Sequence, residues 1–366
     1  MEIAFPDYQN CGLNLTSSIL RYFGTPCDHP TLPFLEEKLE GKSYRNVVLM
    51  LFDGMGMDAL QNHLTKDAFL RAHVAHVLSA VFPSTTTAAT TAIECAKSPA
   101  EHGWLGWTLY FQEIDQAVDI FTNRVQGTGE RAAEDSIVRR YMPIRDVFAQ
   151  MKGDVRAACI SPFGDPRCKT LGEVFQNTER LAAEPGRHFL YAYWGDPDHT
   201  MHDKGVCAPE VGDRIREIDA RVEALCAALP EDTLVLVTAD HGLIDANHLF
   251  VSDSPELMDM LVRPPTVEPR AAAFYVKEEC LGAFPAAFRR AFGQNFILLT
   301  REEFLRSGLL GPGKQNKKLP EIVGDYMAIA TDHDCIDNSP ECTLLKGVHA
   351  GLTTTEMRVP LIVAKD

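Results

Sequence analysis

The stretch NVVLMLFDG at residues 46–54 decides the fold, because it joins a buried strand to a candidate catalytic carboxylate. Residues 46–52 are continuously apolar apart from the first and are rich in branched side chains. This pattern predicts a strand that is buried on both faces of an α/β sheet. Asp53 follows at its carboxyl end, with Gly54 and Gly56 close behind. Open α/β sheets place their chemistry at the carboxyl ends of the strands.

The same arrangement recurs three times further along the chain. The segments are YAYWGDPDHTMH at 191–202, LVLVTADHG at 234–242 and KGVHAGL at 346–352. Together with residue 53 they supply three aspartates and three histidines at strand ends or in loops. These are enough ligands for two metal ions.

Strand-like and helix-like segments alternate along the chain, which predicts helices on both faces of a mainly parallel sheet within one α/β domain over 1–366. The helix expected over 208–229 joins two strands as a βαβ crossover. Another helical stretch is expected near 57–72, and segments 104–145 and 255–325 are expected to be insertions that cap the sheet edge. The remaining strands are predicted at 155–161, 187–194, 233–239, 271–276, 296–300, 326–331 and 359–364.

Composition excludes several classes of protein. The chain has 366 residues and a formal net charge of −16, with no evident basic patch, which argues against binding to nucleic-acid polymers or anionic membranes. No apolar segment is long enough to span a bilayer, and the N-terminus has no secretory pattern. The ten cysteines form no CxxC pair and are expected to be reduced thiols. We therefore expect a cytoplasmic protein.

Taken one at a time, the acidic residues have ordinary explanations. Asp53 could equally cap the helix that follows it. Asp198 and His202 are four residues apart, so one helical turn would bring carboxylate and imidazole to the same metal, but a solvated polar turn is the alternative.

The other candidates are similar. Asp240 and His241 are adjacent at a strand end, where their side chains can diverge toward two ions and Gly242 can let the backbone turn tightly. His349 alone is more typical of a structural residue. Taken together, these residues are better explained as metal ligands, because every one of them falls in a loop of small residues beside an apolar strand.

A two-metal site implies a reaction and a nucleophile. Two divalent ions about 4 Å apart stabilise the attacking and leaving oxygens of a displacement at phosphorus. Aspartate and histidine without thiolate favour Zn²⁺ over Mn²⁺ or iron. The segment FPSTTTAATTAIECA at 82–96 offers hydroxyls at a helix start, where free N–H groups suit phosphoryl oxygens. A simple N-cap cluster is the alternative.

These motifs in this order resemble the alkaline phosphatase superfamily, and within it the type I phosphodiesterase/nucleotide pyrophosphatase family. The resemblance extends over most of the chain and implies an alkaline-phosphatase-like three-layer sandwich. It rests on these segments: FDGMG, FPSTTTAATTAIECAKSPAEHG, YAYWGDPDHTMHDKG, TADHG and HAGLTTTEMRVPLIV.

The resemblance also implies roles for individual residues. The family's nucleophile matches Thr86 when the chain is counted back without gaps from His102 and Gly103, and Pro83 then matches an upstream proline. Thr85 is the second choice. The implied ligands are Asp53, Asp240 and His241 for the metal that also binds Thr86, and Asp198, His202 and His349 for the other.

The chain departs from the family where an asparagine binds a phosphoryl oxygen, because that position falls near Trp107. Backbone N–H groups of residues 85–87 are expected to replace it. Trp104 and Trp107, with Tyr110 and Phe111, form an aromatic cluster that is either ordinary core or a wall that binds substrate.

The prediction is therefore a hydrolase of small-molecule phosphodiesters or pyrophosphates that acts through phosphothreonine at a dinuclear zinc site. A phosphomonoesterase or phosphonate hydrolase is the alternative, and a non-catalytic metal-binding protein the remote one. A monoesterase would need extra positive charge near the nucleophile, for which Lys97, Arg124 and Arg131 are candidates. A sulfatase is disfavoured, because PSTTTAAT lacks the context for formylglycine.

Overall fold

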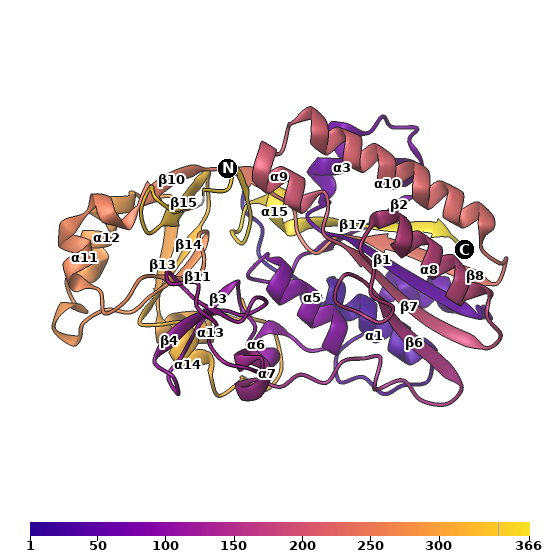
Figure 1. Ribbon diagram of the computed structural model, residues 1–366, viewed down its shortest axis with the longest axis horizontal. Coiled ribbons are helices and arrows are strands. Elements are labelled where there is room, and N and C mark those ends of the chain that lie inside the picture. Colours follow the sequence, from indigo (N-terminus) through magenta and orange to yellow (C-terminus); the bar gives the residue numbers. More distant parts are fainter. Residues whose placement is uncertain (343) are drawn as a thin grey trace.

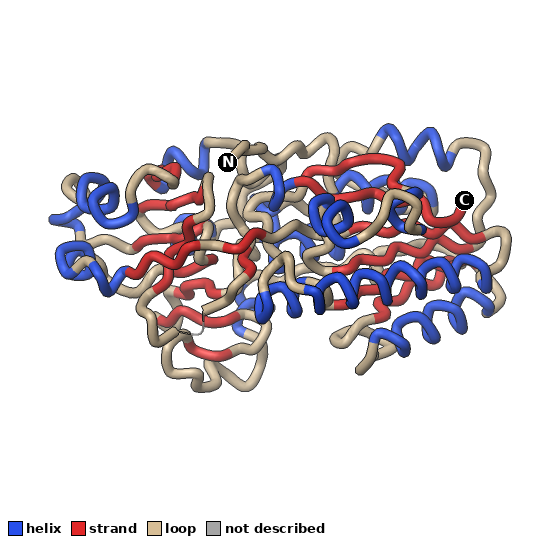
Figure 2. The backbone as a smooth tube through the Cα atoms, turned by 90° about the horizontal axis from the view of Figure 1, so that it is seen from above, coloured by secondary structure: helices blue, strands red, loops and turns tan. Residues whose placement is uncertain are grey.

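The computed structural model describes residues 1–342 and 344–366. The molecule is elongated, and its two main sheets lie at opposite ends (Figures 1 and 2). Among the described residues, no helix is both long and apolar enough to cross a membrane.

The first sheet is the predicted α/β core. Its strand order is β2 (Val74–Ser79), β17 (Arg358–Lys365), β8 (Thr233–Thr238), β1 (Asn46–Phe52), β7 (Arg187–Trp194) and β6 (Val155–Ile160). Strands β8, β1, β7 and β6 pair in parallel, whereas β17 is antiparallel to both of its neighbours. Every residue of β1 is buried, as its apolar sequence predicts.

Helices cover both faces of this sheet and complete the three-layer sandwich (Figure 1). One face carries α3 (Met57–His63), α4 (Phe69–Ala72), α8 (Leu171–Ala183) and α10 (Pro209–Ala228), and the other carries α1 (Gly12–Tyr22), α2 (Pro33–Leu39) and α5 (Thr86–Cys95). Helix α10 is the predicted crossover from β7 to β8. It follows the short helix α9 (Asp198–Lys204).

The helical stretch expected near 57–72 is interrupted, because α3 ends at His63 and α4 begins only at Phe69. Leu64 adopts an extended conformation and ends α3. The Ala68 N–H then donates to the Thr65 carbonyl at 3.1 Å, which closes a turn before α4. The Arg71 guanidinium then binds the backbone carbonyls of Gln61 and Leu64.

The second sheet is antiparallel, and six of its seven strands come from the two segments expected to be insertions. Segment 104–145 supplies β3 (Thr108–Phe111), β4 (Gln116–Asp119) and β5 (Arg124–Val125). The remaining strands are β11 (Thr266–Glu268), β12 (Ala271–Phe274), β13 (Phe296–Thr300) and β14 (Tyr326–Ala330). The two segments meet where Val267 pairs with Thr108. Strands of the two segments therefore join in one sheet.

Smaller elements connect these parts. Two short pairs join β10 (Asn247–Phe250) to β15 (Asp334–Asp337) in parallel and β9 (Ile244–Asp245) to β16 (Gly347–Val348) antiparallel. The other helices are α6 (Pro99–His102), α7 (Ile137–Tyr141), α11 (Pro255–Met260), α12 (Phe284–Phe292), α13 (Arg301–Arg306), α14 (Leu319–Ile322) and α15 (Thr354–Met357), with 3₁₀ turns η1 (Val251–Asp253) and η2 (Glu278–Cys280).

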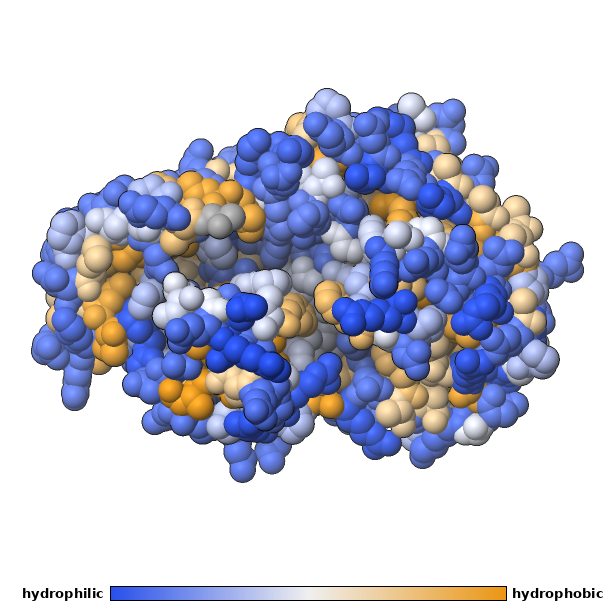
Figure 3. Space-filling model, viewed as in Figure 1, coloured by the Kyte–Doolittle hydropathy of each residue, from blue (hydrophilic) through white to orange (hydrophobic). Residues whose placement is uncertain are grey.

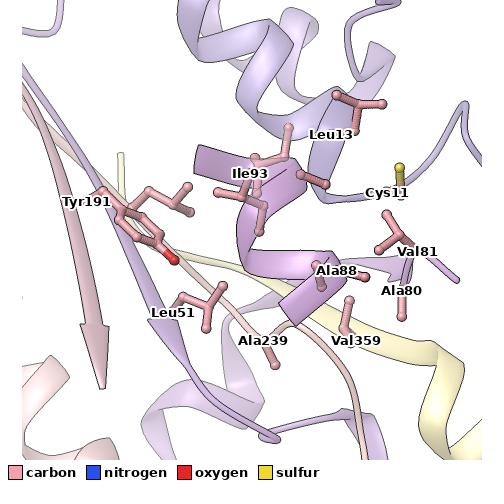
Figure 4. Packing of buried hydrophobic residues seen from close by; sticks show 14 of the residues in the cluster. Cys11, Leu13, Leu51, Ala80, Val81, Ala88, Ile93, Tyr191, Ala239 and Val359 are labelled. Atoms are coloured by element: carbon pink, nitrogen blue, oxygen red, sulfur yellow. The ribbon is translucent and has the colours of Figure 1, made fainter. Parts of the chain in front are cut away.

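Helix α5 is held rigidly in the core. Ala88 and Ile93 lie among the apolar side chains of α1 and the first sheet, including Leu13 and Leu51 (Figure 4). Packing between the two helices is close, because a Cβ on Gly12 would lie only 3.0 Å from Ile93. The absence of a side chain at Gly12 of α1 allows this approach, and α5 is thereby packed closely in the core.

Candidate metal centre

All the predicted ligands lie at one edge of the first sheet. Strands β1, β7 and β8 run in parallel, so their carboxyl ends bring Asp53, Asp198 and Asp240 together. Strand β17 runs in the opposite direction, so the loop that precedes it and carries His349 reaches the same edge. The surface between the two lobes is hollowed on this side of the molecule (Figure 3).

The first ligand cluster consists of Asp53, Asp240 and His241, all of them buried. His241 Nε2 lies 3.4 Å from Asp53 Oδ1 and 3.5 Å from Asp240 Oδ2. The Thr86 hydroxyl lies 3.2 Å from both Asp53 Oδ1 and His241 Nε2. The hydroxyl thus contacts two of the three groups that can ligate one cation.

The second cluster consists of Asp198, His202 and His349. Asp198 lies in the first turn of α9 and His202 in its last turn, so the predicted spacing of four does place them on one face. His202 Nε2 lies 3.1 Å from Asp198 Oδ2, and its Nδ1 lies 2.6 Å from the Gly347 carbonyl. That carbonyl accepts the Nδ1–H, which leaves Nε2 free to ligate a cation.

The two clusters are adjacent. The His241 and His349 rings, one from each cluster, have centroids only 4.0 Å apart, and the His202 and His349 centroids are 5.2 Å apart. The structure therefore brings all six predicted ligands and Thr86 into one site.

Unsatisfied polar atoms show that the site suits cations. Asp198 Oδ1, Asp240 Oδ2 and His349 Nδ1 are buried without a hydrogen-bond partner among the described residues. Buried polar atoms are seldom left unpaired, because each one costs about 1–3 kcal/mol. Each cluster contains at least one such atom, so two bound cations would satisfy the set.

The pKa shifts reflect the same crowding of charge. Burial raises the pKa of Asp53 well above its usual value, and the carboxylates of Asp240 and Asp198 raise it further. Burial, with His241 and His202 nearby, lowers the pKa of His349 well below its usual value, which keeps the imidazole neutral. Burial also opposes charge on His202, but the Asp198 carboxylate outweighs it and raises the pKa to about 9.

Of the three adjacent threonines, only Thr86 faces the metal ligands. It is the first residue of α5 and is partly exposed, whereas Thr85 and Thr87 are buried. The first bond within the helix runs from the Ala89 N–H to the Thr85 carbonyl, so the N–H groups of residues 86–88 precede the helical ladder. These groups suit the oxygens of a phosphoryl group.

Glu268 is a site residue that sequence reasoning missed. Its Oε1 accepts hydrogen bonds from the Thr85 hydroxyl and the Trp107 N–H, both at 2.8 Å. Burial raises its pKa to about 7, although these hydrogen bonds and the charges of His202 and His241 lower it. No motif marks this residue in the sequence, because β11 reaches the site only through its pairing with β3.

The backbone beside Glu268 has an unusual conformation. Val267 has φ of 75°, which a branched side chain rarely adopts. A Cβ on Gly106 would lie 2.6 Å from the Val267 carbonyl oxygen, so only glycine fits there. Strained backbone of the kind found at Val267 is concentrated at functional sites.

Gly242 does not form the predicted tight turn. It allows a close approach of two backbone segments instead, because a Cβ there would lie 2.0 Å from the Thr355 carbonyl oxygen.

The aromatic residues proposed to contact substrate separate into two environments. Trp104 is buried in the core, where its Nε1–H donates to the Met142 carbonyl and Arg139 lies over its ring. It is therefore not placed as a wall of the site, and that expectation needs correction. Trp107 is 45% exposed and packs edge-to-face with Phe121.

The basic residues that follow the nucleophile helix are engaged elsewhere. Lys97 pairs with Asp28 and Glu101 at the surface. The guanidinium groups of Arg124 and Arg131 bind backbone carbonyls within their own loop. None of the three therefore supplies the extra positive charge that a monoesterase site would require.

Fold and site together define a member of the alkaline phosphatase superfamily. The profile of the type I phosphodiesterase/nucleotide pyrophosphatase family matches residues 47–282, which is well over half of the chain. The chain belongs to this family, and it is a hydrolase that acts on phosphoester bonds. A comparison with curated proteins finds no match.

Solved structures with the same fold include murine ectonucleotide pyrophosphatase/phosphodiesterase 5, at 17% identity and a TM-score of 0.65, with 86% of this chain and 87% of that chain covered. Phosphonoacetate hydrolase from Sinorhizobium meliloti 1021 in complex with phosphonoformate is 16% identical with a TM-score of 0.66, and 93% of each chain is covered. An inactive variant of the murine protein in complex with AMP also matches, at 17% identity and a TM-score of 0.63, over 86% of this chain and 87% of that one.

Proposed function

We propose that the protein hydrolyses small-molecule phosphodiesters or pyrophosphates at a dinuclear zinc site, with Thr86 as the nucleophile. One observation carries the proposal: the Thr86 hydroxyl lies at equal distances of 3.2 Å from Asp53 and His241 at the start of α5. Asp53, Asp240 and His241 would hold one ion, and Asp198, His202 and His349 the other. When bound, the two ions would supply Lewis acidity for charge that develops on the phosphoryl oxygens.

The chain's own residues suggest the order of events. The Thr86 hydroxyl donates to Asp53 Oδ1, so its proton is already directed toward a carboxylate. Thr86 Oγ then attacks phosphorus in line, the new O–P bond forms, and the ester or anhydride O–P bond opposite breaks. The leaving oxygen departs with the electron pair. Water cleaves the resulting phosphothreonine in a second displacement and restores the hydroxyl.

Surrounding groups hold the nucleophile and its target. The N–H groups at the start of α5 are placed to bind a phosphoryl oxygen, in place of the family's asparagine side chain. The Tyr193 hydroxyl donates to Asp53 Oδ2 at 2.5 Å and fixes the orientation of that carboxylate. The Thr85 hydroxyl donates to Glu268, which leaves Thr86 as the threonine beside the predicted metal ligands.

Two features favour a diester over a monoester. Lys97, Arg124 and Arg131 are engaged elsewhere, so the second negative charge of a monoester lacks the partner they would offer. Trp107 is exposed beside the nucleophile loop and is tied to it through Glu268. An exposed indole suits a stacked base or an aromatic ester group. The murine relative's complex with AMP is in keeping with a nucleotide substrate.

The adjacent threonines provide a matched test. We expect zinc-loaded protein to cleave bis-p-nitrophenyl phosphate faster than p-nitrophenyl phosphate. Thr86→Ala should abolish this activity, whereas Thr85→Ala should retain it within about tenfold, since the Thr85 hydroxyl donates to Glu268 and Thr86 contacts the predicted metal ligands. Equal losses in both variants would reject the nucleophile assignment.

Phosphonate hydrolysis is the second candidate, in view of the likeness to phosphonoacetate hydrolase. Phosphate release from phosphonoacetate, measured in the same preparation, separates the two activities. Faster turnover of phosphonoacetate than of the diester would overturn the diester proposal while retaining Thr86 as nucleophile.

A further inference from the structure

A third cluster of potential ligands lies outside the proposed catalytic site. It consists of His248 on β10 with Cys335 and Asp337 on β15. In the parallel register His248 is paired with Cys335, and Asp337 lies two residues further along β15. Because side chains alternate along a strand, Cys335 and Asp337 lie on the same face. Local strand geometry thus brings an imidazole, a thiol and a carboxylate together.

The distances are close to those that one metal ion requires. His248 Nδ1 lies 2.7 Å from Asp337 Oδ2 and 3.3 Å from Cys335 Sγ, and Cys335 Sγ lies 3.6 Å from Asp337 Oδ2. A tetrahedral zinc ion with ordinary bond lengths separates such atoms by about 3.3–3.6 Å. On binding zinc, only the separation between His248 Nδ1 and Asp337 Oδ2 would have to widen by more than a few tenths of an ångström. Cys335 is fully buried, whereas the other two side chains are mostly buried.

The hydrogen bonds of His248 show which of its nitrogens is available. Its Nε2 lies 3.0 Å from the Leu345 carbonyl oxygen, which can only accept, so Nε2 carries a proton. In a neutral imidazole Nδ1 then carries a lone pair and no proton, and this lone pair faces the Oδ2 atom of Asp337. Two acceptors at 2.7 Å require a cation between them, either a proton or a metal. A backbone carbonyl on the second nitrogen is typical of metal-bound histidine.

This geometry excludes a cysteine nucleophile. In a Cys-His-Asp arrangement the thiol and the carboxylate bind opposite nitrogens of the imidazole. Here both contact Nδ1, and a backbone carbonyl occupies Nε2. The three groups converge on one point in the manner of ligands.

We propose that His248, Cys335 and Asp337 form a third metal site, which binds Zn²⁺ in a structural role. Thiolate with imidazole and carboxylate is a ligand set that zinc accepts. Binding would displace the thiol proton. The site would join β10 to β15 and, through Leu345, to the loop that leads to His349. It is independent of the proposed function, because none of its ligands belongs to the catalytic clusters.

Cobalt substitution tests the proposal, because only this site contains a thiolate. Protein stripped with a chelator and reloaded with Co²⁺ under reducing conditions should show thiolate-to-cobalt charge-transfer absorption. Cys335→Ser should lose that absorption and bind one ion fewer per chain by native mass spectrometry. Matched controls are Cys226→Ser, which alters another buried thiol, and Cys342→Ser, which alters an exposed one, and both should retain the absorption.

The outcomes are distinguishable from failure of the proposed function. Absence of thiolate absorption in the unmodified protein, or its persistence in Cys335→Ser, would overturn the third site whatever the catalytic result. Such an outcome would assign the cluster to an imidazolium–carboxylate pair beside a thiol. If Cys335→Ser fails to fold, Asp337→Asn keeps the thiol and should weaken cobalt binding by about tenfold or more. Unchanged cobalt affinity in that variant would equally overturn the proposal.

Discussion

Replacing Glu356 with glutamine should destabilise the protein by about 4 kcal/mol, because it breaks a fully buried ion pair. The Arg270 and Glu356 side chains both have 0% exposure. Arg270 Nε and Nη2 donate to the two oxygens of Glu356 at 2.7 and 2.8 Å. Arg270 directly precedes β12, so the ion pair ties that strand to Glu356. Glu356 Oε1 also accepts a hydrogen bond from the N–H of Gly351, two residues after His349, and so supports the loop that carries this predicted ligand.

The magnitude follows from the bonds that are lost. Glu356 Oε2 accepts from the Thr353 N–H and hydroxyl as well as from Arg270. A glutamine NH₂ in either orientation would face at least two donors, and each lost bond to a charged group costs about 1.5–3 kcal/mol. At about 2.1 cal/mol/K per residue, a chain of 366 residues has an unfolding entropy of about 0.8 kcal/mol/K. A loss of about 4 kcal/mol therefore lowers Tm by about 5 °C.

Urea unfolding and calorimetry at saturating zinc would measure the effect. Glu256→Gln is the matched control, because Glu256 pairs with Arg290 at the surface, where both side chains are more than half exposed. That substitution should cost less than about 1 kcal/mol. A double replacement of Arg270 and Glu356 by methionine should cost less than the sum of the single replacements. Equal costs for Glu356→Gln and Glu256→Gln would refute the reasoning.

Three further predictions concern the site. Chelation should lower Tm, since Asp53, Asp198 and Asp240 are left crowded, and zinc at about 100 times its Kd should restore about 3 kcal/mol; a Tm insensitive to zinc would contradict this. Trp107→Ala should raise KM for aromatic diesters about fivefold or more with little change in kcat, and should leave alkyl diesters unaffected. In metal-free protein, burial raises the pKa of Glu268 from 4.5 to about 7, so its contribution to stability is present below pH 4.5 and lost as pH rises through 7. The Glu268→Gln side chain stays neutral at every pH. The free energy of unfolding of this variant, measured with urea, should therefore rise relative to that of the unmodified protein between about pH 5 and pH 8. A difference that does not change with pH would reject the raised pKa of Glu268.

The first sheet could be predicted because its signals are local. Strand β1 is continuously apolar and is followed directly by Asp53, and the same order recurs before Asp198 and Asp240. Parallel pairing then fixes where those residues meet, since the carboxyl ends of neighbouring strands share one edge. The choice between Thr85 and Thr86 was harder, because it depends on the direction of each side chain at the start of α5.

Strands β12, β13 and β14 of the second sheet were predicted, but their assembly into a separate sheet was not, because it depends on contacts between distant segments. Strand β3 meets β11 through Val267 and Thr108, which are far apart in the sequence. Only that pairing brings Glu268 to Thr85. The same limit explains Trp104, which sequence pattern alone did not separate from Trp107 although one indole is buried and the other exposed.

The two sheets therefore contribute different parts of the site. The first sheet holds the six predicted ligands and Thr86, and α5 is fixed to it by close packing against α1. The second sheet contributes Glu268 from β11, and the indole of Trp107 directly precedes β3. In the proposed mechanism the groups at the edge of the first sheet contact the reacting atoms, so changes there should act mainly on kcat. Changes around Trp107 should act mainly on KM, because that side chain can contact only the parts of a substrate that do not react. Substrate preference could thus diverge through the second sheet while the metal-ligand geometry remains fixed by the first.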